Sequence, residues 1–185
     1  TPDEDFGLLL TALQLLDERI IEVGLRVLVI VTGKGPERSF YETKISRLKL
    51  SNVTIATVWL EAADYPKLLA CADVGISLHT STSGLDLPMK VLDLFGCQVP
   101  VLAHDFDCLH ELVEDDVNGR VFRTSEQLAE LLYELLKPLA ETMHSVSNHS
   151  FGKLAEYSNN LEDRERWSSN WIMNAMPVIL RSTPL

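Results

Sequence analysis

The chain has 185 residues, 46% of them hydrophobic, and carries a formal net charge of −11. This length and apolar content are typical of one folded domain with a packed core, and they exclude wholesale disorder. The acidic balance argues against a nucleic-acid-binding protein, because neutralising phosphates requires clustered lysine and arginine.

Apolar runs alternate with amphipathic segments from the start of the chain to Lys137. The pattern predicts strands in RVLVIVTGKGP, NVTIATVWL, DVGISLH, VPVLA and GRVF. A helix over 6–16 precedes the first strand, and one helix follows each strand in turn, over 37–48, 64–72, 89–95, 109–113 and 125–136. Ser125 is the predicted N-cap of the last helix. Strands that alternate with helices indicate a doubly wound α/β fold with a parallel sheet. Because such a fold places a strand before its first helix, we expect a strand to be missing before Phe6.

The C-terminal part of the sequence has a different pattern. A polar stretch, ETMHSVSNHSFG, is followed by two helix-like pieces. In the second piece Trp167, Trp171 and Ile172 form an apolar stripe, which is typical of a docking face or of a core. We therefore predict a Rossmann-like domain over 1–143 and a helical extension over 144–185.

Open parallel sheets bind ligands beyond the carboxyl ends of their strands, so the loops after the strands are the first candidates for a site. After the first strand, Gly33 allows backbone amides to approach a ligand and Lys34 can face an anion, although a simple turn fits as well. After the second strand, Trp59 can pack against a flat ring, but we favour a core tryptophan.

The stretch STSGLDLPMKVLD contains the densest set of candidate residues. Ser83 supplies a hydroxyl, Gly84 permits a tight turn, and Pro88 suits the first turn of a helix whose N-terminus attracts phosphate. One helical turn separates Lys90 from Asp93, so the lysine can face a phosphate while the carboxylate accepts hydrogen bonds from ribose hydroxyls. The alternative is an ion pair on a solvated helix. We favour a ligand site, because apolar neighbours predict a well-covered helix.

His79, which ends the third strand, can donate to a sugar hydroxyl or a phosphate, or can be satisfied locally. The sequence has no phosphate-binding Walker loop and no metal-ligand cluster, so we expect no metal and no cofactor. The three cysteines lack metal-ligand spacing, and we interpret Cys97 and Cys108 as small buried thiols.

A family resemblance sharpens this interpretation. The run ADVGISLHTSTSGLDLPMKVLDLFGCQVPVLA, followed by HELVEDDVNGRVF, closely resembles the chitobiosyldiphosphodolichol β-mannosyltransferases. VTGKGP, WLEAADYPKLL and RWSSNW resemble the same family in order and spacing, so the resemblance covers most of residues 4 to 181. That family transfers mannose from GDP-mannose to dolichol-linked chitobiose on the cytosolic face of the endoplasmic reticulum membrane.

The resemblance implies a GT-B arrangement, in which two Rossmann-like domains face a cleft and the C-terminal one holds the nucleotide sugar. This chain resembles that C-terminal domain. The implied donor-binding residues are Gly33, Lys34, His79, Ser83, Gly84, Leu85, Asp86, Lys90 and Asp93. The resemblance implies that Asp93 lies at the ribose, that Gly84, Leu85, Asp86 and Lys90 lie around the diphosphate and mannose, and that Gly33 and Lys34 lie across the cleft. Many retaining relatives carry paired glutamates eight residues apart, but Leu85 stands eight before Asp93, with Asp86 adjacent, so we carry over no role for the earlier acid.

In that family the N-terminal domain carries the membrane anchor and much of the acceptor site. We therefore expect this chain to be inactive alone, to reach the lipid-linked chitobiose acceptor through the missing domain, and to have other endoplasmic-reticulum glycosyltransferases as potential partners. The general base is expected in the missing half, so no catalytic residue is assigned. Two alternatives remain open: a non-catalytic nucleotide-sugar-binding or partner-binding paralogue, and a GT-B-like epimerase that prefers UDP-sugars.

Overall fold

The computed structural model describes residues 4–80, 83, 85–143, 152–162, 164 and 167–181. In chain order its elements are α1 (Phe6–Ile20), β1 (Val27–Thr32), α2 (Arg38–Arg47), β2 (Val53–Val58), α3 (Tyr65–Leu69), β3 (Gly75–Ser77), α4 (Met89–Gly96), β4 (Val101–His104), the 3-10 helix η1 (Leu109–Glu111), β5 (Gly119–Phe122), α5 (Ser125–Met143), α6 (Gly152–Glu162), α7 (Trp167–Asn170), the π-helix η2 (Trp171–Ala175) and α8 (Met176–Arg181). The alternation of strands and helices confirms the predicted α/β class.

All strand pairings between the named strands are parallel, as the sequence predicts, but the strands form two hydrogen-bonded groups. β1 pairs with β2 along its whole length, from Val27 opposite Val53 to Thr32 opposite Val58. The second group has the order β3-β4-β5. The predicted parallel direction of the strands is therefore confirmed, but the strands do not form one continuous hydrogen-bonded sheet.

Helix α1 begins where a side chain satisfies one of the free amides of its first turn. The Oδ1 atom of Asp5 accepts a hydrogen bond from the backbone N–H of Leu8 at 3.1 Å, which is the usual role of an N-cap residue. The helix buries a stripe at helical spacing that includes Leu9, Leu13 and Leu16. Because Ile20 continues this stripe and is fully buried, the helix runs four residues beyond the predicted end at residue 16.

Helix α5 differs from its prediction at both ends. Thr124 rather than Ser125 caps the first turn, because its hydroxyl accepts from the N–H of Gln127 at 3.3 Å. The Ser125 hydroxyl instead donates to the carbonyl of Leu8 in α1 at 3.0 Å. The helix then continues through Pro138 to residue 143, since buried residues such as Ala140 keep it packed where a proline normally ends a helix.

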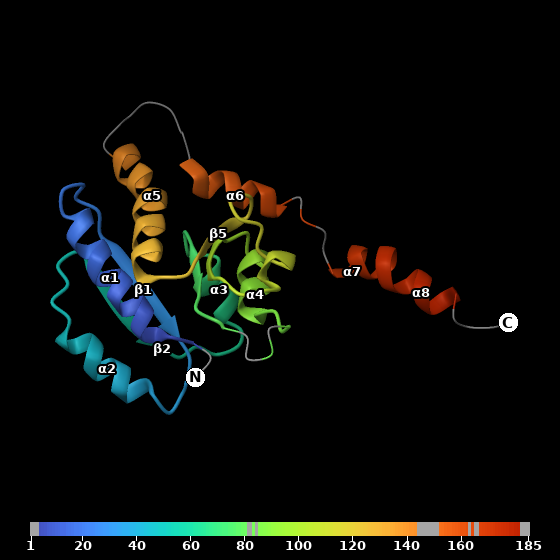
Figure 1. The fold of residues 1–185 in the computed structure, drawn as a ribbon, viewed down its shortest axis with the longest axis horizontal. Helices are drawn as coiled ribbons and strands as arrows, with labels where there is room; N and C mark the ends of the chain where they lie inside the picture. The colour runs from blue at the N-terminus through green and yellow to red at the C-terminus, as the bar shows by residue number, and fades with distance from the viewer. Residues whose placement is uncertain are drawn as a thin grey trace.

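The described residues form two core clusters, which lie on opposite faces of β4. The larger one lies beneath α1, α5 and α6, and α5 packs on both of the other two helices (Figure 1). Leu13, Leu128 and Tyr157 are each fully buried in it. The smaller cluster joins α4 to β4 through Val91, Phe95 and other residues. Helix α4 is thereby fixed against the sheet at a defined place next to the carboxyl end of β3.

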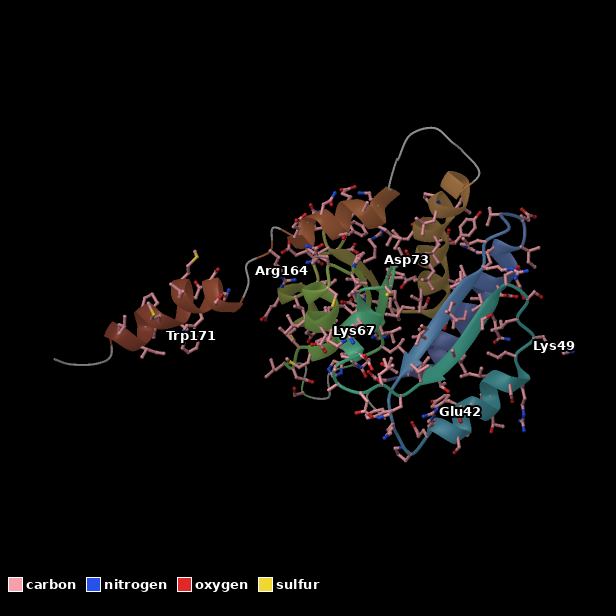
Figure 2. All side chains as sticks on the ribbon, turned by 180° about the vertical axis from the view of Figure 1, so that it is seen from behind. Glu42, Lys49, Lys67, Asp73, Arg164 and Trp171 are labelled. Carbon is pink, nitrogen blue, oxygen red and sulfur yellow. The ribbon has the colours of Figure 1, made fainter. Side chains whose placement is uncertain are left out.

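The last helical segment, from α7 to α8, extends away from this body (Figures 1 and 2). Trp171 is 42% exposed and Ile172 is 54% exposed, so the predicted apolar stripe is no core. The side chain of Trp167 lies outside the described residues. Within the described parts of the chain, none of the helices combines the length and apolar content needed to cross a bilayer.

Candidate functional site

Three of the predicted site residues meet just beyond the carboxyl end of β3. The Nε2 atom of His79 lies 2.9 Å from Oδ2 of Asp86, and the Ser83 hydroxyl donates to Oδ1 of the same carboxylate at 3.0 Å. The side chain of His79 is only 14% exposed, and the ring of Phe106 meets its ring edge-on at 5.8 Å. His79 is therefore satisfied locally by Asp86, which fixes the orientation of the imidazole.

In the loop between β3 and α4, the described residue Leu85 extends an apolar side chain into solvent. The backbone N–H of Leu85 donates to the Ser83 hydroxyl at 3.2 Å, and 82% of Leu85 is exposed. Gly84, which we predicted to form a tight turn at this point, lies outside the described residues. Pro88 occupies the N-cap position of α4, next to the first-turn position predicted for it.

Lys90 lies in the first turn of α4 and makes an ion pair with Glu4. Glu4 also forms an isolated backbone bridge with His79, so this residue joins Lys90 to the His79–Asp86–Ser83 group. Sequence reasoning missed Glu4, because it precedes α1 and no motif links it to α4. The sequence signal that could have pointed to Glu4 is its position just before the first helix, next to the place where a strand was expected.

Asp93 lies on an exposed face of α4 and interacts with Tyr65 at the start of α3. Burial and the neighbouring Asp93 carboxylate, which accepts a hydrogen bond from the tyrosine, raise the pKa of Tyr65 above its usual value. The hydroxyl therefore stays protonated and orients Asp93. The prediction of a well-covered helix is wrong on this side, since Met89 is 68% exposed and Leu92 is 43% exposed.

Gly33 and Lys34 form a separate group with Trp59, at the ends of β1 and β2. Gly33 has φ of 145°, a conformation that favours glycine, and its N–H donates to the carbonyl of Val58 at 3.3 Å. The Nζ atom of Lys34 lies 4.1 Å from the centroid of the Trp59 ring. Trp59 is 52% exposed, so our preferred interpretation of it as a core residue is wrong. The pair instead forms a cationic, aromatic surface.

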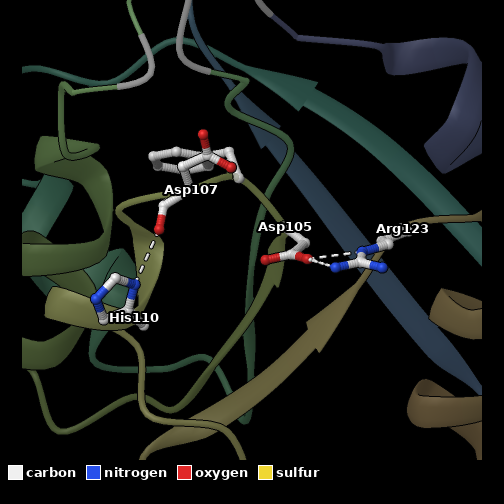
Figure 3. Close-up of a pocket in the computed structure, with 5 residues that line it drawn as sticks. Asp105, Asp107, His110 and Arg123 are labelled. Carbon is white, nitrogen blue, oxygen red and sulfur yellow. Dashed lines mark hydrogen bonds and ion pairs between the residues drawn. The ribbon is translucent and has the colours of Figure 1, made fainter.

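The segments after β4 and β5 add residues that sequence reasoning overlooked. An open cavity of about 410 Å³ is lined by Asp105, Phe106, Asp107, His110 and Arg123 (Figure 3). Arg123 donates from Nε to Oδ2 of Asp105 at 2.6 Å, and Nδ1 of His110 lies 2.9 Å from the carbonyl oxygen of Asp107. The cavity adjoins the first group, because Phe106 contacts His79. Its position directly after a predicted strand could have revealed it.

These groups offer complementary chemistry at the ends of several strands. Lys34, Lys90 and Arg123 carry positive charge, Asp86 and Asp93 are acceptors, and Trp59 offers an aromatic face. Among the residues that the structure describes, no cluster of three or more histidine, cysteine or acidic side chains is placed to hold a metal ion. Groups of these kinds can contribute to binding an anionic ligand that carries hydroxyl groups and a ring.

Comparison with known families places this site in context. Residues 2–138 match the family model described as "Glycosyl transferases group 1". This match includes the candidate residues from Gly33 to Asp93 as well as the cavity after β4.

Relatives with assigned names cover nearly the whole chain. It is 43% identical over 184 residues to the human protein named chitobiosyldiphosphodolichol beta-mannosyltransferase, an alignment that covers 97% of this chain and 38% of the relative. The Dictyostelium discoideum protein of the same name is 43% identical over 195 residues, covering 93% and 39%. A third relative, "UDP-glycosyltransferase TURAN" of Arabidopsis thaliana, is 42% identical over 194 residues, covering 97% and 41%. The chain thus spans about two fifths of the length of these relatives.

Two solved structures share the fold. The pneumococcal O-GlcNAc transferase GtfA, in complex with UDP and GlcNAc, matches with a TM-score of 0.61 at 14% identity, over 97% of this chain and 34% of the other. Anabaena HepE in complex with UDP-glucose matches with a TM-score of 0.57 at 22% identity, over 88% and 40%. Both matches confirm the predicted Rossmann-like α/β fold.

Proposed function

Because the chain belongs to the group 1 glycosyl transferases, we propose that it is the donor-binding part of a mannosyltransferase that uses GDP-mannose. The acceptor in this proposal is dolichol-diphosphate-linked chitobiose, and the product is an N-glycan precursor. The observation that carries the proposal is the 43% identity, over 97% of this chain, to the human protein named for that reaction. The site residues add a chemical reason for the assignment.

Lys90 is proposed to stabilise the leaving group. In glycosyl transfer with inversion, an acceptor hydroxyl attacks C1 of mannose while the bond from C1 to the phosphate oxygen breaks. Negative charge then grows on the departing GDP, and a cation in the first turn of a helix, together with the free amides there, stabilises it. Lys90 is paired with the Glu4 carboxylate. A bound diphosphate must therefore either share the Lys90 ammonium group with Glu4 or take the place of Glu4.

Asp93 is proposed to hold the ribose. An exposed carboxylate accepts two hydrogen bonds, which matches the neighbouring hydroxyls of a ribose. The Tyr65 hydroxyl keeps this carboxylate oriented from α3. Asp86, His79, Ser83, Gly84 and Leu85 then lie on the mannose and diphosphate side, and Gly33 and Lys34 complete the donor site from β1.

The acceptor and the general base are assigned to polypeptide beyond this chain. The chain spans 38% of the length of the human relative, which leaves room for a second domain that carries the acceptor site and a membrane anchor. The base that takes the proton from the acceptor hydroxyl belongs to that domain. We therefore place the complete protein at the endoplasmic reticulum membrane, on its cytosolic face, and expect the 185-residue chain to be inactive alone.

Calorimetric titration with GDP, UDP and GDP-mannose tests the donor assignment. We expect GDP to bind more tightly than UDP, and Asp93→Ala to weaken GDP binding about tenfold or more, because it removes two hydrogen bonds to a charged acceptor. Asp73→Ala is the matched control, since Asp73 is an exposed carboxylate before the amino end of β3 (Figure 2). Equal GDP affinity of the Asp93→Ala variant and the unsubstituted chain would remove the ribose assignment.

A UDP-dependent glycosyltransferase is the second candidate, because the chain is 42% identical to a protein named "UDP-glycosyltransferase TURAN". Tighter binding of UDP than of GDP in the same titration favours it. Turnover of GDP-mannose by the isolated chain with a lipid-linked chitobiose acceptor contradicts the need for a second domain. Donor binding without any activity in the full-length protein supports a non-catalytic paralogue.

A further inference from the structure

Glu4 is fixed beside the residues proposed to bind the donor. Its backbone forms an antiparallel bridge with the backbone of His79, and its carbonyl accepts a hydrogen bond from the N–H of Phe6 at 3.0 Å. The next residue, Asp5, is the N-cap of α1. These contacts hold the Glu4 backbone on both sides, so its carboxylate has a defined place in the site.

The Glu4 carboxylate makes an ion pair with Lys90. The side chain of Glu4 is 29% exposed and that of Lys90 is 39% exposed, so water screens this pair less than it screens a pair on the open surface. Two other carboxylates of the same region, Asp86 and Asp93, accept hydrogen bonds from hydroxyl groups near them. Glu4 thus offsets the charge of the lysine that is proposed to face the diphosphate.

The ion pair changes the charge that an incoming anion meets. Lys90 contributes one positive charge and Glu4 contributes one negative charge, so the two cancel. A phosphate oxygen that contacts the Lys90 ammonium group therefore also lies near the Glu4 carboxylate and is repelled by it. This repulsion grows with each further negative charge on the phosphate.

The donor and the product of the proposed reaction differ in this charge. In GDP-mannose the terminal phosphate is esterified to the sugar and carries one negative charge. Transfer breaks the bond from C1 to the phosphate oxygen, the electron pair stays on that oxygen, and the acceptor hydroxyl gives its proton to the base. The terminal phosphate of GDP then carries close to two charges near pH 8, because the second ionisation of such a phosphate occurs at about pH 6.

We propose that Glu4 is a specificity-determining residue that makes the site favour a nucleoside-diphosphate sugar over the free nucleoside diphosphate. This inference rests on the proposed function, in which Lys90 faces the diphosphate. Glu4 repels the product more strongly than the donor, so it favours the exchange of GDP for GDP-mannose after each transfer. The same carboxylate weakens the attraction of Lys90 for the leaving group, so Glu4 favours product release at the expense of the cleavage step.

Calorimetric titration at pH 8 with GDP and with GDP-mannose tests the proposal on the 185-residue chain and on its Glu4→Gln variant. This substitution removes the charge and keeps the size of the side chain. We expect the affinity for GDP to rise at least about tenfold and that for GDP-mannose to rise only about threefold, so the ratio of the two dissociation constants changes at least about threefold. Glu18→Gln is the matched control, since it removes one charge from an exposed position of α1 and should leave the ratio unchanged.

Two results would overturn the proposal. In the first, the unsubstituted chain and Glu4→Gln have the same ratio of dissociation constants. In the second, Glu4→Gln binds both ligands more weakly, which identifies Glu4 as a residue that positions Lys90. Glu4→Ala must show the same change of ratio as Glu4→Gln, so the test stays decisive if one of these two variants does not fold.

The result for Glu4 is separable from the donor assignment. If UDP binds more tightly than GDP, the assignment to GDP-mannose fails, and the same comparison with UDP and UDP-glucose decides on Glu4. If Asp93→Ala leaves GDP binding unchanged, the ribose assignment fails, while the ratio of dissociation constants still decides on Glu4. If none of these four ligands binds to any form of the chain, both proposals are wrong.

Discussion

Asp17 joins α1 to the start of β2 through a buried carboxylate, and its replacement gives the sharpest test of the packing. The residue is 5% exposed. Its carboxylate accepts hydrogen bonds from the backbone N–H groups of Ser51 at 3.0 Å, Asn52 at 2.7 Å and Val53 at 2.8 Å. Asp17→Ala removes the acceptor for three donors at once.

The exposure of the three donors sets the size of the effect. Val53 is 4% exposed, so its N–H loses its partner without access to water, at a cost of about 2 kcal/mol. Ser51 is exposed and Asn52 is half-buried, so water replaces most of their bonds, at about 0.5 kcal/mol each. We therefore expect Asp17→Ala to lower the free energy of unfolding by about 3 kcal/mol. Asp17→Asn keeps a neutral oxygen acceptor and should cost about 1 to 1.5 kcal/mol.

The pH dependence follows from the same contacts. Burial raises the pKa of Asp17, but the three backbone N–H groups outweigh it and hold the pKa below its usual value. The folded pKa is thus lower than the unfolded value of about 3.9. The carboxylate stabilises the fold above that unfolded value, and this contribution is lost as the pH falls from there through the folded pKa. In Asp17→Asn this acid-side loss should shrink.

Urea denaturation at pH 7 and along a series down to pH 2.5 measures both effects. Glu18→Ala is the control, because Glu18 is the exposed neighbour on the same helix and should change stability by less than about 0.5 kcal/mol. The reasoning is refuted if Asp17→Ala matches this control, or if Asp17→Asn is as destabilised as Asp17→Ala.

Three further predictions concern a close backbone contact, a buried hydroxyl and the thiols. Gly119→Ala should destabilise the fold by about 2 kcal/mol or more in thermal denaturation, because an added Cβ would lie 2.1 Å from a carbonyl oxygen of β4. Gly35→Ala is the control, since the Cβ position there has open space around it, and equal melting temperatures of the two variants contradict the prediction. Tyr157→Phe should cost about 1 kcal/mol in urea denaturation, since its hydroxyl donates at 2.6 Å to an exposed carboxylate, and an unchanged midpoint counts against that bond. In a thiol-reactivity assay the exposed Cys71 should react quickly. Cys108 should react only on unfolding, because burial and nearby carboxylates raise the pKa of its thiol. Fast labelling of Cys108 in the folded chain disproves its burial.

Local sequence patterns predicted the order of the elements. The helix predicted over 64–72 is shorter, at Tyr65–Leu69, and the segment predicted as a helix over 109–113 forms only a 3-10 helix at Leu109–Glu111. The run RVLVIVTGKGP contains β1, because a continuous β-branched segment ended by glycine has few other structures in an α/β protein. The helix at 89–95 was predicted to within a residue, since Pro88 restricts its start and apolar spacing defines its buried face. The buried thiol was predicted for Cys108 and confirmed, whereas Cys97 is only half-buried.

The relations between distant segments were not predictable in the same way. The pairing of Lys90 with Glu4 depends on the sheet bringing α4 next to the start of α1, and no local pattern encodes it. Trp59 was assigned to the core from its hydrophobicity, but it follows the end of β2, where Lys34 and solvent are its surroundings. The division of the strands into two groups likewise depends on which strands lie side by side in space. The alternation of strands and helices along the sequence does not reveal it.

The consecutive residues Glu4 and Asp5 act on two different helices. Asp5 caps α1 through Leu8, while Glu4 pairs with Lys90 of α4. Because neighbouring residues perform both tasks, an insertion of one residue between Asp5 and Phe6 would displace both contacts together. Length variation during evolution should therefore be rare at this junction, and we expect it in the turn after α1, where Gly24 has no close neighbour around its Cβ position. Glu4 and Asp5 thus mark a junction at which the number of residues is fixed by two contacts at once.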